Sequence, residues 1–221
     1  MALALDSLGS VGFTTALGTL SHTCSGANLI LIVGNATDSG GQNTGTVTYA
    51  GVNMTLVGTS SENASRSSSI WKLIAPATGA NNIIVSTNQS GRSGVFSYSY
   101  TGADQTSGVE GSVFGTANNG TAAGTITTVS DNAVLLAVWR GKNAAGGALP
   151  SNTLVGSINQ SFSYGWAVRY TNAISPAGLG TVGGTHASAN WSLSAFSIIP
   201  AVGGGGEVAS VSWRSLLGVG R

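Results

Sequence analysis

The sequence predicts an all-β protein, a jelly-roll-like antiparallel β-sandwich followed by an extended C-terminal arm. Short runs of β-branched and aromatic residues alternate with Ser, Thr and Asn, which is the two-residue period of a strand. The chain contains 34 glycines, many of which lie between these runs, as expected of turns. No stretch of any length repeats apolar residues at the spacing of an amphipathic helix, so we expect very little helix.

Residues 1 to about 27 predict a strand followed by loops. The strand is expected at residues 2–5, and residues 11–20 alternate only weakly between apolar and polar side chains. Leu29 to Val33 is apolar at every position and too short for a helix, which predicts a strand buried on both faces. Residues 35–45 are polar and predict a loop.

The segment from Thr46 to Gly102 is the clearest series of strands and turns. Ala50-Gly51 predicts a hairpin turn, because Gly51 can take the positive φ that such turns require. Pro76 is expected to end the preceding strand, since proline cannot donate a ladder hydrogen bond. Residues 60–69 are polar and are expected to form a loop.

Alternation also assigns faces to two strands of this segment. One strand is expected to be half buried, with its apolar side chains on one face: Val52, Met54 and Leu56. The other is expected to carry its aromatic residues on one face and Ser97 and Ser99 on the opposite face: Phe96, Tyr98 and Tyr100.

The remainder of the sandwich reads as a long connection followed by five strands. Residues 102–124 are rich in Gly, Ala, Asn and Thr, with one short strand expected at 109–114. The run from Ala133 to Trp139 predicts a second strand buried on both faces, after a turn at Asp131-Asn132. The other four strands are expected at residues 125–129, 154–158, 163–170 and 191–199.

The two halves of the chain resemble each other weakly. Three pairs of segments recur in the same order: 27–35 with 132–141, 69–80 with 164–180, and 95–103 with 195–203. Two similar halves with sheets packed face to face would form a sandwich over residues 1–202.

The C-terminus predicts a tethered docking arm. Residues 203–206 are four glycines, a flexible linker by composition, and residues 207–221 form the arm. An arm this short cannot bury its own apolar groups, so it is expected to dock on its own domain or on a neighbouring protein. The expected partner-binding residues are Val208, Val211, Trp213, Arg214, Leu216 and Leu217.

The charge balance excludes several classes of partner. Only 7% of residues are charged and the formal net charge is +1, while 42% are hydrophobic, enough for a core. The two Lys and six Arg are scattered, which argues against a nucleic-acid-binding face and against a polybasic membrane anchor. A chain this close to neutral lacks self-repulsion and is expected to associate readily.

No pattern of residues predicts catalysis, a metal or a cofactor. The seven acidic residues form no obvious catalytic pair, and neither His22 nor His186 has the neighbours that a Ser-His-Asp triad would show. Cys24 is the single cysteine, cannot form an intrachain disulfide, and is expected to be a small buried core residue. We therefore expect a protein that is not an enzyme.

Carbohydrate binding is the alternative function. It would use aromatic rings as stacking platforms beside Asn and Ser: Trp71, Trp139, Trp166, Trp191, Tyr164 and Tyr170. These rings would equally fill a sandwich core, and the sequence leaves both interpretations open.

No membrane or export segment is expected. The longest apolar run, at residues 133–139, is far shorter than the roughly 20 residues that span a bilayer. The N-terminus MALALDSLGS has no positively charged region, so no signal peptide is expected and the protein would be made in a cytoplasm.

Several motifs resemble a β-sandwich domain of tailed-phage structural proteins, which also occurs in uncharacterised secreted bacterial proteins. The most distinctive are VTYAGV, which begins at Val47, and LIAPATG, which begins at Leu73. The resemblance covers about residues 1–201 and carries no catalytic residues. It implies a virion protein, such as a capsid decoration subunit or a tail-fibre domain, that binds copies of itself and other virion proteins such as the major capsid protein. It also leaves open a glycan-binding module of a tail fibre or surface adhesin.

Overall fold

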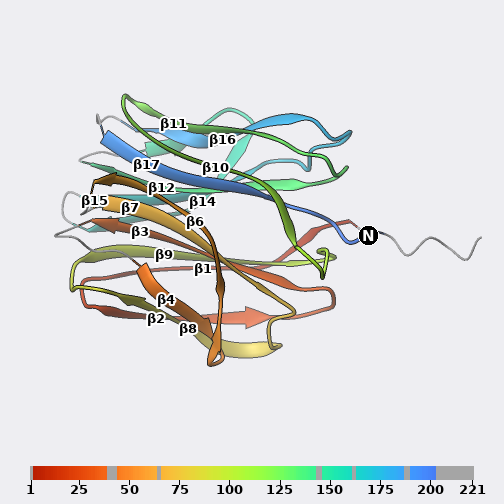
Figure 1. Cartoon of the computed structure of the whole chain (residues 1–221), viewed down its shortest axis with the longest axis horizontal. Helices are drawn as coiled ribbons and strands as arrows, with labels where there is room; N and C mark the ends of the chain where they lie inside the picture. The colour runs from red at the N-terminus through yellow and green to blue at the C-terminus, as the bar shows by residue number, and fades with distance from the viewer. Residues whose placement is uncertain are drawn as a thin grey trace, which may run out of the picture.

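The computed structural model describes residues 2–38, 44–63, 66–142, 146–160, 163–186 and 190–202. Within these residues the chain is all-β with antiparallel sheets packed together, which confirms the predicted fold class (Figure 1). The strands of the N-terminal half are β1 (Ala4–Phe13), β2 (Leu17–Cys24), β3 (Ile30–Asp38), β4 (Thr44–Tyr49), β5 (Val52–Asn53), β6 (Thr55–Asn63), β7 (Arg66–Ile74), β8 (Gly79–Thr87) and β9 (Arg92–Thr101). Those of the C-terminal half are β10 (Val109–Asn118), β11 (Thr121–Thr127), β12 (Val134–Lys142), β13 (Gly146–Ala148), β14 (Asn152–Gln160), β15 (Ser163–Tyr170), β16 (Leu179–His186) and β17 (Asn190–Ile198).

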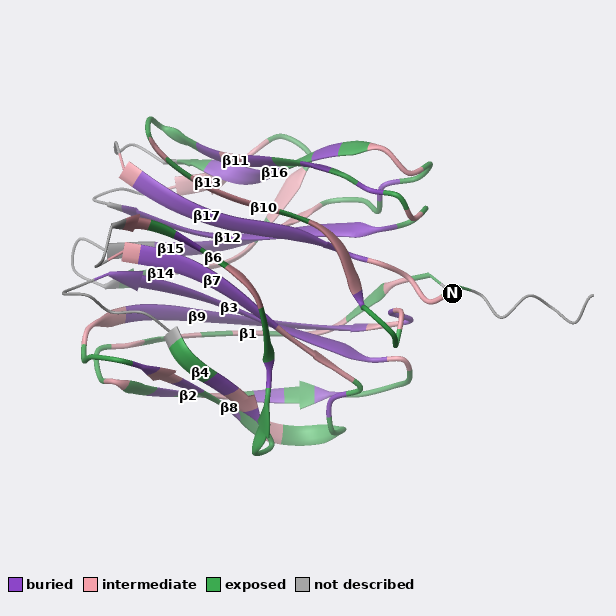
Figure 2. Cartoon of the chain, in the orientation of Figure 1, coloured by how far each residue is buried: buried purple, intermediate pink, exposed green. Residues whose placement is uncertain are grey.

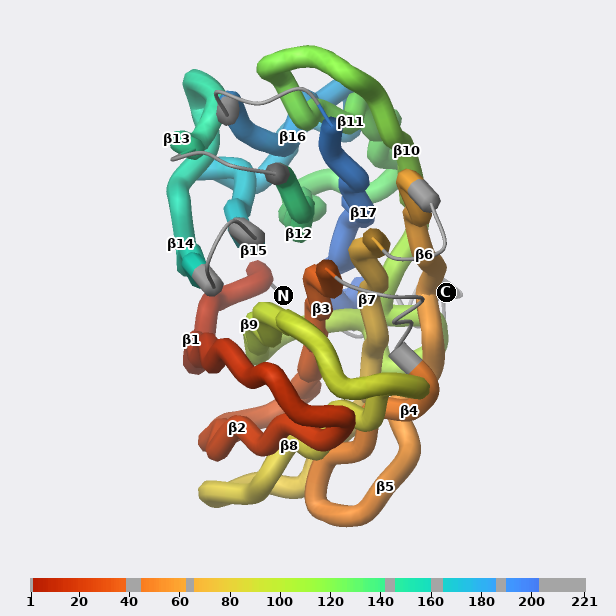
Figure 3. The backbone as a smooth tube through the Cα atoms, turned by 90° about the vertical axis from the view of Figure 1, so that its left-hand side faces the viewer, coloured from red at the N-terminus to blue at the C-terminus, as the bar shows by residue number. Residues whose placement is uncertain are grey.

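The strands form four sheets. In the N-terminal half, a central sheet has the order β1-β9-β3-β7-β6 and an outer sheet has the order β2-β8-β4-β5. In the C-terminal half, the central sheet is β10-β17-β12-β15-β14 and the outer sheet is β11-β16-β13. The four sheets stack as layers, with the two central sheets in the middle (Figures 1 and 3).

Both halves follow the same path. Along the chain, β1, β2, β3 and β4 fall alternately in the central and outer sheets, and β7, β8 and β9 do the same. The series β10 to β17 repeats this alternation, with β10 in the place of β1 and β17 in the place of β9. Each half is therefore a jelly roll by itself. The weak sequence repeat is real, but each half supplies two sheets, whereas we expected the halves to build one sandwich together.

Three apolar cores separate the four layers. The core between the central sheets contains Ile32 and Tyr98 from one half and Leu136 and Phe196 from the other. The two outer cores lie within the halves, around Trp71 in the N-terminal half and around the Trp139–Trp166 pair in the C-terminal half. The central strands are consequently buried along most of their length (Figure 2), as β3, β9 and β17 show.

An approximate two-fold axis relates the halves. β1 packs against β14 of the other half, and β10, the counterpart of β1, packs against β6, the counterpart of β14. In the middle, β3 crosses its own counterpart β12, and Val138 lies against the backbone of Gly34. The turns before these two strands also match, since Asn28 and Asn132 both have positive φ, 50° and 64°.

Several predicted elements are confirmed. Ala50 and Gly51 form the turn between β4 and β5 with φ of 49° and 79°, and Tyr49 pairs with Val52. β7 ends at Ile74, two residues before Pro76. Both runs that are apolar throughout, in β3 and β12, are buried on both faces. The aromatic residues of β9 face the core between the central sheets: Phe96, Tyr98 and Tyr100.

Other expectations were wrong. A loop was expected at residues 60–69, but residues 60–63 and 66–69 belong to β6 and β7, where Ser60 pairs with Ser68. The long connection at 102–124 contains the ten-residue β10 and most of β11, and β16 lies in a Gly-rich stretch where no strand was expected. These strands lack the alternation of large apolar and polar residues by which strands are predicted. Their side chains are small because the layers approach closely, which favours Gly and Ser over large apolar residues. Val52 and Leu56 are exposed, and only Met54 points inward, because the chain changes sheets between β5 and β6.

Candidate functional site

The predicted partner-binding residues lie beyond the last described residue, Val202. Val208, Val211, Trp213, Arg214, Leu216 and Leu217 all belong to residues 203–221, outside the described part of the chain. The described polar side chains belong to the two jelly rolls.

Each acidic side chain in the described residues is held by protein groups. Oδ1 of Asp104 accepts hydrogen bonds from the backbone N–H of Thr106, Ser107 and Gly108, at 3.0, 2.7 and 3.2 Å. These bonds, above all those of Ser107 and Gly108, lower the pKa of Asp104 below its usual value.

Two further carboxylates fasten turns in the C-terminal half. Glu110 accepts from the backbone N–H of Val129 and Ser130, and Asp131 accepts from the backbone N–H of Ala177 at 2.7 Å. Both side chains bind backbone donors at the ends of strands, where ladder hydrogen bonds stop. The charges of Glu110 and Asp131 therefore stabilise turns of the fold.

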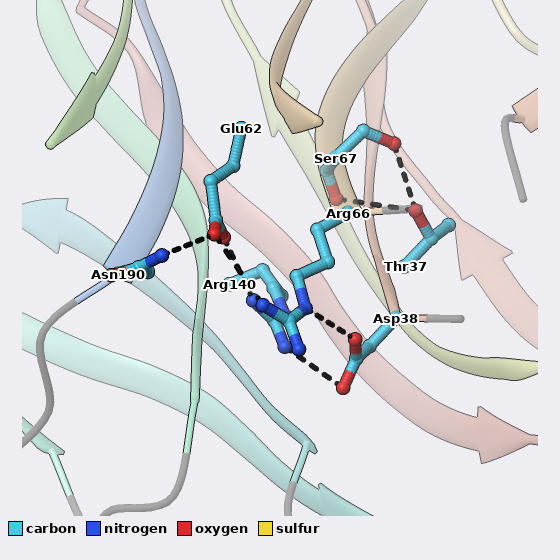
Figure 4. Close-up of polar contacts among 7 residues, drawn as sticks. All are labelled: Thr37, Asp38, Glu62, Arg66, Ser67, Arg140 and Asn190. Carbon is cyan, nitrogen blue, oxygen red and sulfur yellow. Dashed lines mark hydrogen bonds and ion pairs between the residues drawn. The ribbon is translucent and has the colours of Figure 1, made fainter. Parts of the chain in front are cut away.

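The largest polar group is a charge cluster between the two halves (Figure 4). Arg140 of β12 has a fully buried side chain, whose Nη1 donates to Oε2 of Glu62 at 3.1 Å and whose Nη2 lies 2.8 Å from Oδ2 of Asp38. The Asp38 contact is an ion pair without the alignment of a hydrogen bond. Arg66 completes the cluster, with Nε 3.0 Å from Oδ1 of Asp38 and Nη1 3.4 Å from Oε1 of Glu62. Asn190 of β17 also donates to Glu62, at 2.6 Å.

The cluster is electrically neutral, with two arginines and two carboxylates. Burial lowers the pKa of Arg140, and the nearby charges of Asp38 and Glu62 oppose that shift. Asp38, Glu62 and Arg66 come from the N-terminal half, whereas Arg140 and Asn190 come from the C-terminal half. The arrangement therefore connects the two jelly rolls, because every ion pair of Arg140 crosses between them.

A second polar cluster surrounds His22 in the N-terminal half. Nδ1 of His22 lies 2.8 Å from the hydroxyl of Ser97, and Nε2 lies 3.0 Å from that of Ser99. Ser99 donates in turn to Oδ2 of Asp6, at 2.7 Å. Asp6 also accepts the backbone N–H of Ser25. Since Ser99 gives its proton to Asp6, it must accept from Nε2–H, and Ser97 can donate to Nδ1.

The buried position of His22 favours its neutral form. Burial lowers the pKa of His22, and the nearby Asp6 only partly opposes that shift. Burial disfavours the Asp6 carboxylate as well, but the hydrogen bonds from Ser25 and Ser99 together outweigh it and lower the pKa of Asp6. Cys24 is buried nearby, as predicted, and burial raises the pKa of its thiol. The ring of Tyr49 makes a T-shaped contact with that of His22. Burial raises the pKa of Tyr49 to about 12.

This cluster contains Ser, His and Asp but lacks the order of a catalytic triad. In a triad the carboxylate orients the histidine and the histidine activates a reachable serine. Here a serine stands between His22 and Asp6, and both Ser97 and Ser99 have no exposed surface. The histidine therefore fills a structural position. Sequence reasoning missed its partners because they lie 75 and 77 residues away along the chain.

The tryptophans predicted as sugar-stacking platforms are core residues. Trp71, Trp139, Trp166 and Trp191 are at most 7% exposed. Trp139 and Trp166 stack with ring centroids 5.5 Å apart, and the indole N–H of Trp191 donates to Asn119 at 2.9 Å. These four rings cannot stack on a sugar from solvent, which corrects that part of the alternative.

The outward faces of the outer sheets carry hydroxyl groups and no charged residue among those described. On β11 and β16 they present Thr125 and Thr181, whose hydroxyls lie 3.0 Å apart. On β2 the outward residues are Leu17, Thr19, Ser21 and Thr23. The outer faces therefore mix hydroxyl groups with a few exposed apolar side chains and carry no charge among the described residues.

The described part of the chain contains no group of three or more His, Cys, Asp or Glu side chains placed to hold a metal ion. Within the same residues, no helix is long and apolar enough to cross a membrane. Comparison of the chain with protein-family models, with curated proteins and with solved structures gives no match in any of the three.

Proposed function

We propose that the protein is a non-enzymatic structural subunit of a phage particle, most simply a capsid decoration or surface subunit, that attaches through its termini, including the C-terminal arm. The observation that supports this best is the use of charge. The carboxylates of the described chain bind backbone amides, hydroxyls or arginines, and the outer sheet faces are uncharged. In this proposal the sheets act as a scaffold, and the termini bind the neighbouring proteins.

The net charge and the apolar C-terminal residues also favour association with other proteins. Its formal net charge of +1 gives little self-repulsion. The apolar groups of residues 207–221 need a surface to cover them. Copies of the same chain and other virion proteins, such as a major capsid protein, would supply that surface.

The test compares the full chain with a chain ending at Val202. We expect light scattering to show a defined oligomer for the full chain and a mass near one chain for the truncated one, with both unfolding at similar temperatures. A truncated chain that keeps the full oligomer mass would contradict the role of the arm.

If both chains are monomers, self-association through the arm is excluded, and the glycan-binding alternative is then tested on a glycan array. A positive result there would require a site other than the four buried tryptophans.

A further inference from the structure

We infer that the free edge of β1 receives the C-terminal arm of a second copy as an added antiparallel strand. This inference rests on the proposed function, because it names the surface on which the arm would act. β1 is the first strand of its central sheet, and no described strand pairs with its outer edge. An unpaired edge offers a row of backbone donors and acceptors to another chain.

The edge strands of the central sheets are not equally open. All four contain an irregularity in pairing, a feature that blunts edges against unwanted association. The irregularity of β14 falls between Leu154 and Gly156, and β6 has two. That of β1 falls near its start, between Leu5 and Ser7, so that pairing with β9 is regular from Ser7 to Phe13.

β1 also has exposed apolar side chains at this edge. Leu5 and Leu8 are 37% and 44% exposed, and they lie opposite Tyr100 and Tyr98. The irregularity brings these two leucines onto the same face although they are three residues apart. On β10, the counterpart of β1, no large apolar side chain is exposed. β1 therefore combines a regular free edge with apolar surface that an added strand would cover.

The arm has the pattern of such a strand. Val211 and Trp213 alternate with Ser210, Ser212 and Arg214, the period of a strand with one apolar face. Its length also fits, since residues 207–221 exceed the ten residues of β1.

Direction decides between the same copy and a second one. Every described strand pair is antiparallel, the pairing that is slightly the more stable per residue. The described chain leaves the molecule beside the first residue of β1: Ala201 donates to Gly102, and the preceding Thr101 pairs with Ala4. An antiparallel strand must begin at the other end of β1, roughly 30 Å away at about 3.3 Å per residue. The four glycines alone span at most about 14 Å. A copy's own arm would reach that end only with all of residues 202–209 fully extended, whereas the arm of another copy can begin there without that stretch.

The test changes the edge in the full chain and measures mass by light scattering. Leu5→Lys and Leu8→Lys are combined in one variant, with Leu179→Lys as the control, because Leu179 is 71% exposed on an outer sheet. Charge on an edge strand opposes strand addition. We expect the edge variant to associate at least about tenfold more weakly than the wild type, a change of about 1.4 kcal/mol. The control should keep the wild-type mass, and unfolding curves should show that both variants remain folded.

A cross-linking experiment identifies the occupant. Chains with Leu8→Cys are mixed with chains carrying Trp213→Cys under oxidising conditions, and a covalent dimer of the two is expected. Cys24 does not compete because it is 1% exposed. A Leu179→Cys chain in place of the Leu8→Cys chain should give no such dimer.

The outcomes separate this inference from the proposed function. If truncation at Val202 gives monomers but the edge variant stays assembled, the β1 site is wrong and the role of the arm stands. An intrachain cross-link in the Leu8→Cys/Trp213→Cys double variant would overturn the second-copy occupant. If truncation changes nothing, both proposals fail.

Discussion

His22 shows how burial and hydrogen bonding determine the protonation state of one side chain. Ser97 and Ser99 occupy both ring nitrogens, and the charge of Asp6 is one hydroxyl away. A neutral histidine with Nε2–H donating to Ser99 fits this chain of bonds, and burial disfavours a second ring proton. The pKa of His22 is accordingly lowered in the folded state.

This lowered pKa predicts a dependence of stability on pH. The unfolded chain takes up a proton on His22 as pH falls below about 6.5, while the folded chain resists it, so the contribution of His22 to stability is full above that pH and declines as pH falls toward the folded pKa. We expect the free energy of unfolding to fall between pH 7 and pH 5. His22→Gln should lose that part of the slope, which denaturant titrations at the two pH values measure.

The carboxyl group in contact with this network, Asp6, titrates outside the pH window of the comparison. The pKa of Asp6 is lowered from 3.8, so its contribution is lost only at more acidic pH. His186 is unchanged in His22→Gln and cancels in the comparison. Equal slopes for the two proteins would show that His22 is not held neutral.

The contacts of individual side chains were harder to predict from the sequence than the strands or the fold class. Burial of Cys24 followed from its type alone. The network of His22 did not, because strands distant in sequence bring its members together. The sequence around Arg140 does contain a usable signal. An arginine that directly follows a run of apolar residues typical of a buried strand is expected to be buried and to need acidic partners. Which acids it meets depends on how the two halves pack.

At the level of elements, the crossing of β3 and β12 sets how closely the central sheets approach. A Cβ added at Gly34 would lie 2.2 Å from Cγ2 of Val138 and 3.1 Å from its Cβ. No rotation of the Val138 side chain alone removes the second contact, so the sheets would have to move apart.

We therefore expect Gly34→Ala to reduce the free energy of unfolding by about 1–3 kcal/mol, the range for overpacking a core. Val138→Ala removes the opposing methyl groups, so the double variant should lose less than the sum of the two single variants. Gly45→Ala is the control, because its nearest neighbour would be 3.6 Å away in an exposed strand. Chemical denaturation of the four variants measures these differences, and additive losses would contradict the close contact.

The elements that the sequence predicts best are those with large apolar residues. Leu29 to Val33 and Ala133 to Trp139 are predictable as buried strands because a short run of apolar side chains on both faces is typical of a strand covered on both sides. Ser67 to Ser69 are equally buried but belong to a polar stretch that predicts a loop. Their hydroxyls pack between layers and bind partners such as Ser194, which a single sequence does not reveal.

At the scale of the whole molecule, the charge cluster ties one jelly roll to the other. Removing one member of a buried ion pair costs several kcal/mol because its partners remain buried without compensation. We expect Arg140→Met to reduce the free energy of unfolding by about 3 kcal/mol or more. Arg169→Met, at a partly exposed position, should cost less than about 1 kcal/mol. Denaturant titration measures both, and a loss for Arg140→Met no greater than the control would show that the cluster contributes little.

The repeat in the sequence located matching strands but not how the halves pack. The asymmetry at their contact is the reason. Gly34 faces Val138, its own counterpart, and Arg140 takes the place that Ala36 has in the other half. The contact surface of each half therefore complements that of the other half and not its own. The packing of the two halves depends on residues that differ between them, which a comparison based on sequence similarity does not detect.

The two-fold relation between the jelly rolls has a consequence for valency. Two separate jelly rolls related in this way would bring two equivalent tails to an assembly and could bind two neighbours symmetrically. In the present chain, both jelly rolls belong to one polypeptide and share the single tail that follows β17. Under the proposed role of the arm, each molecule would offer one donor segment and one β1 edge, a head-to-tail arrangement whose rings or rows would grow by one neighbour at a time.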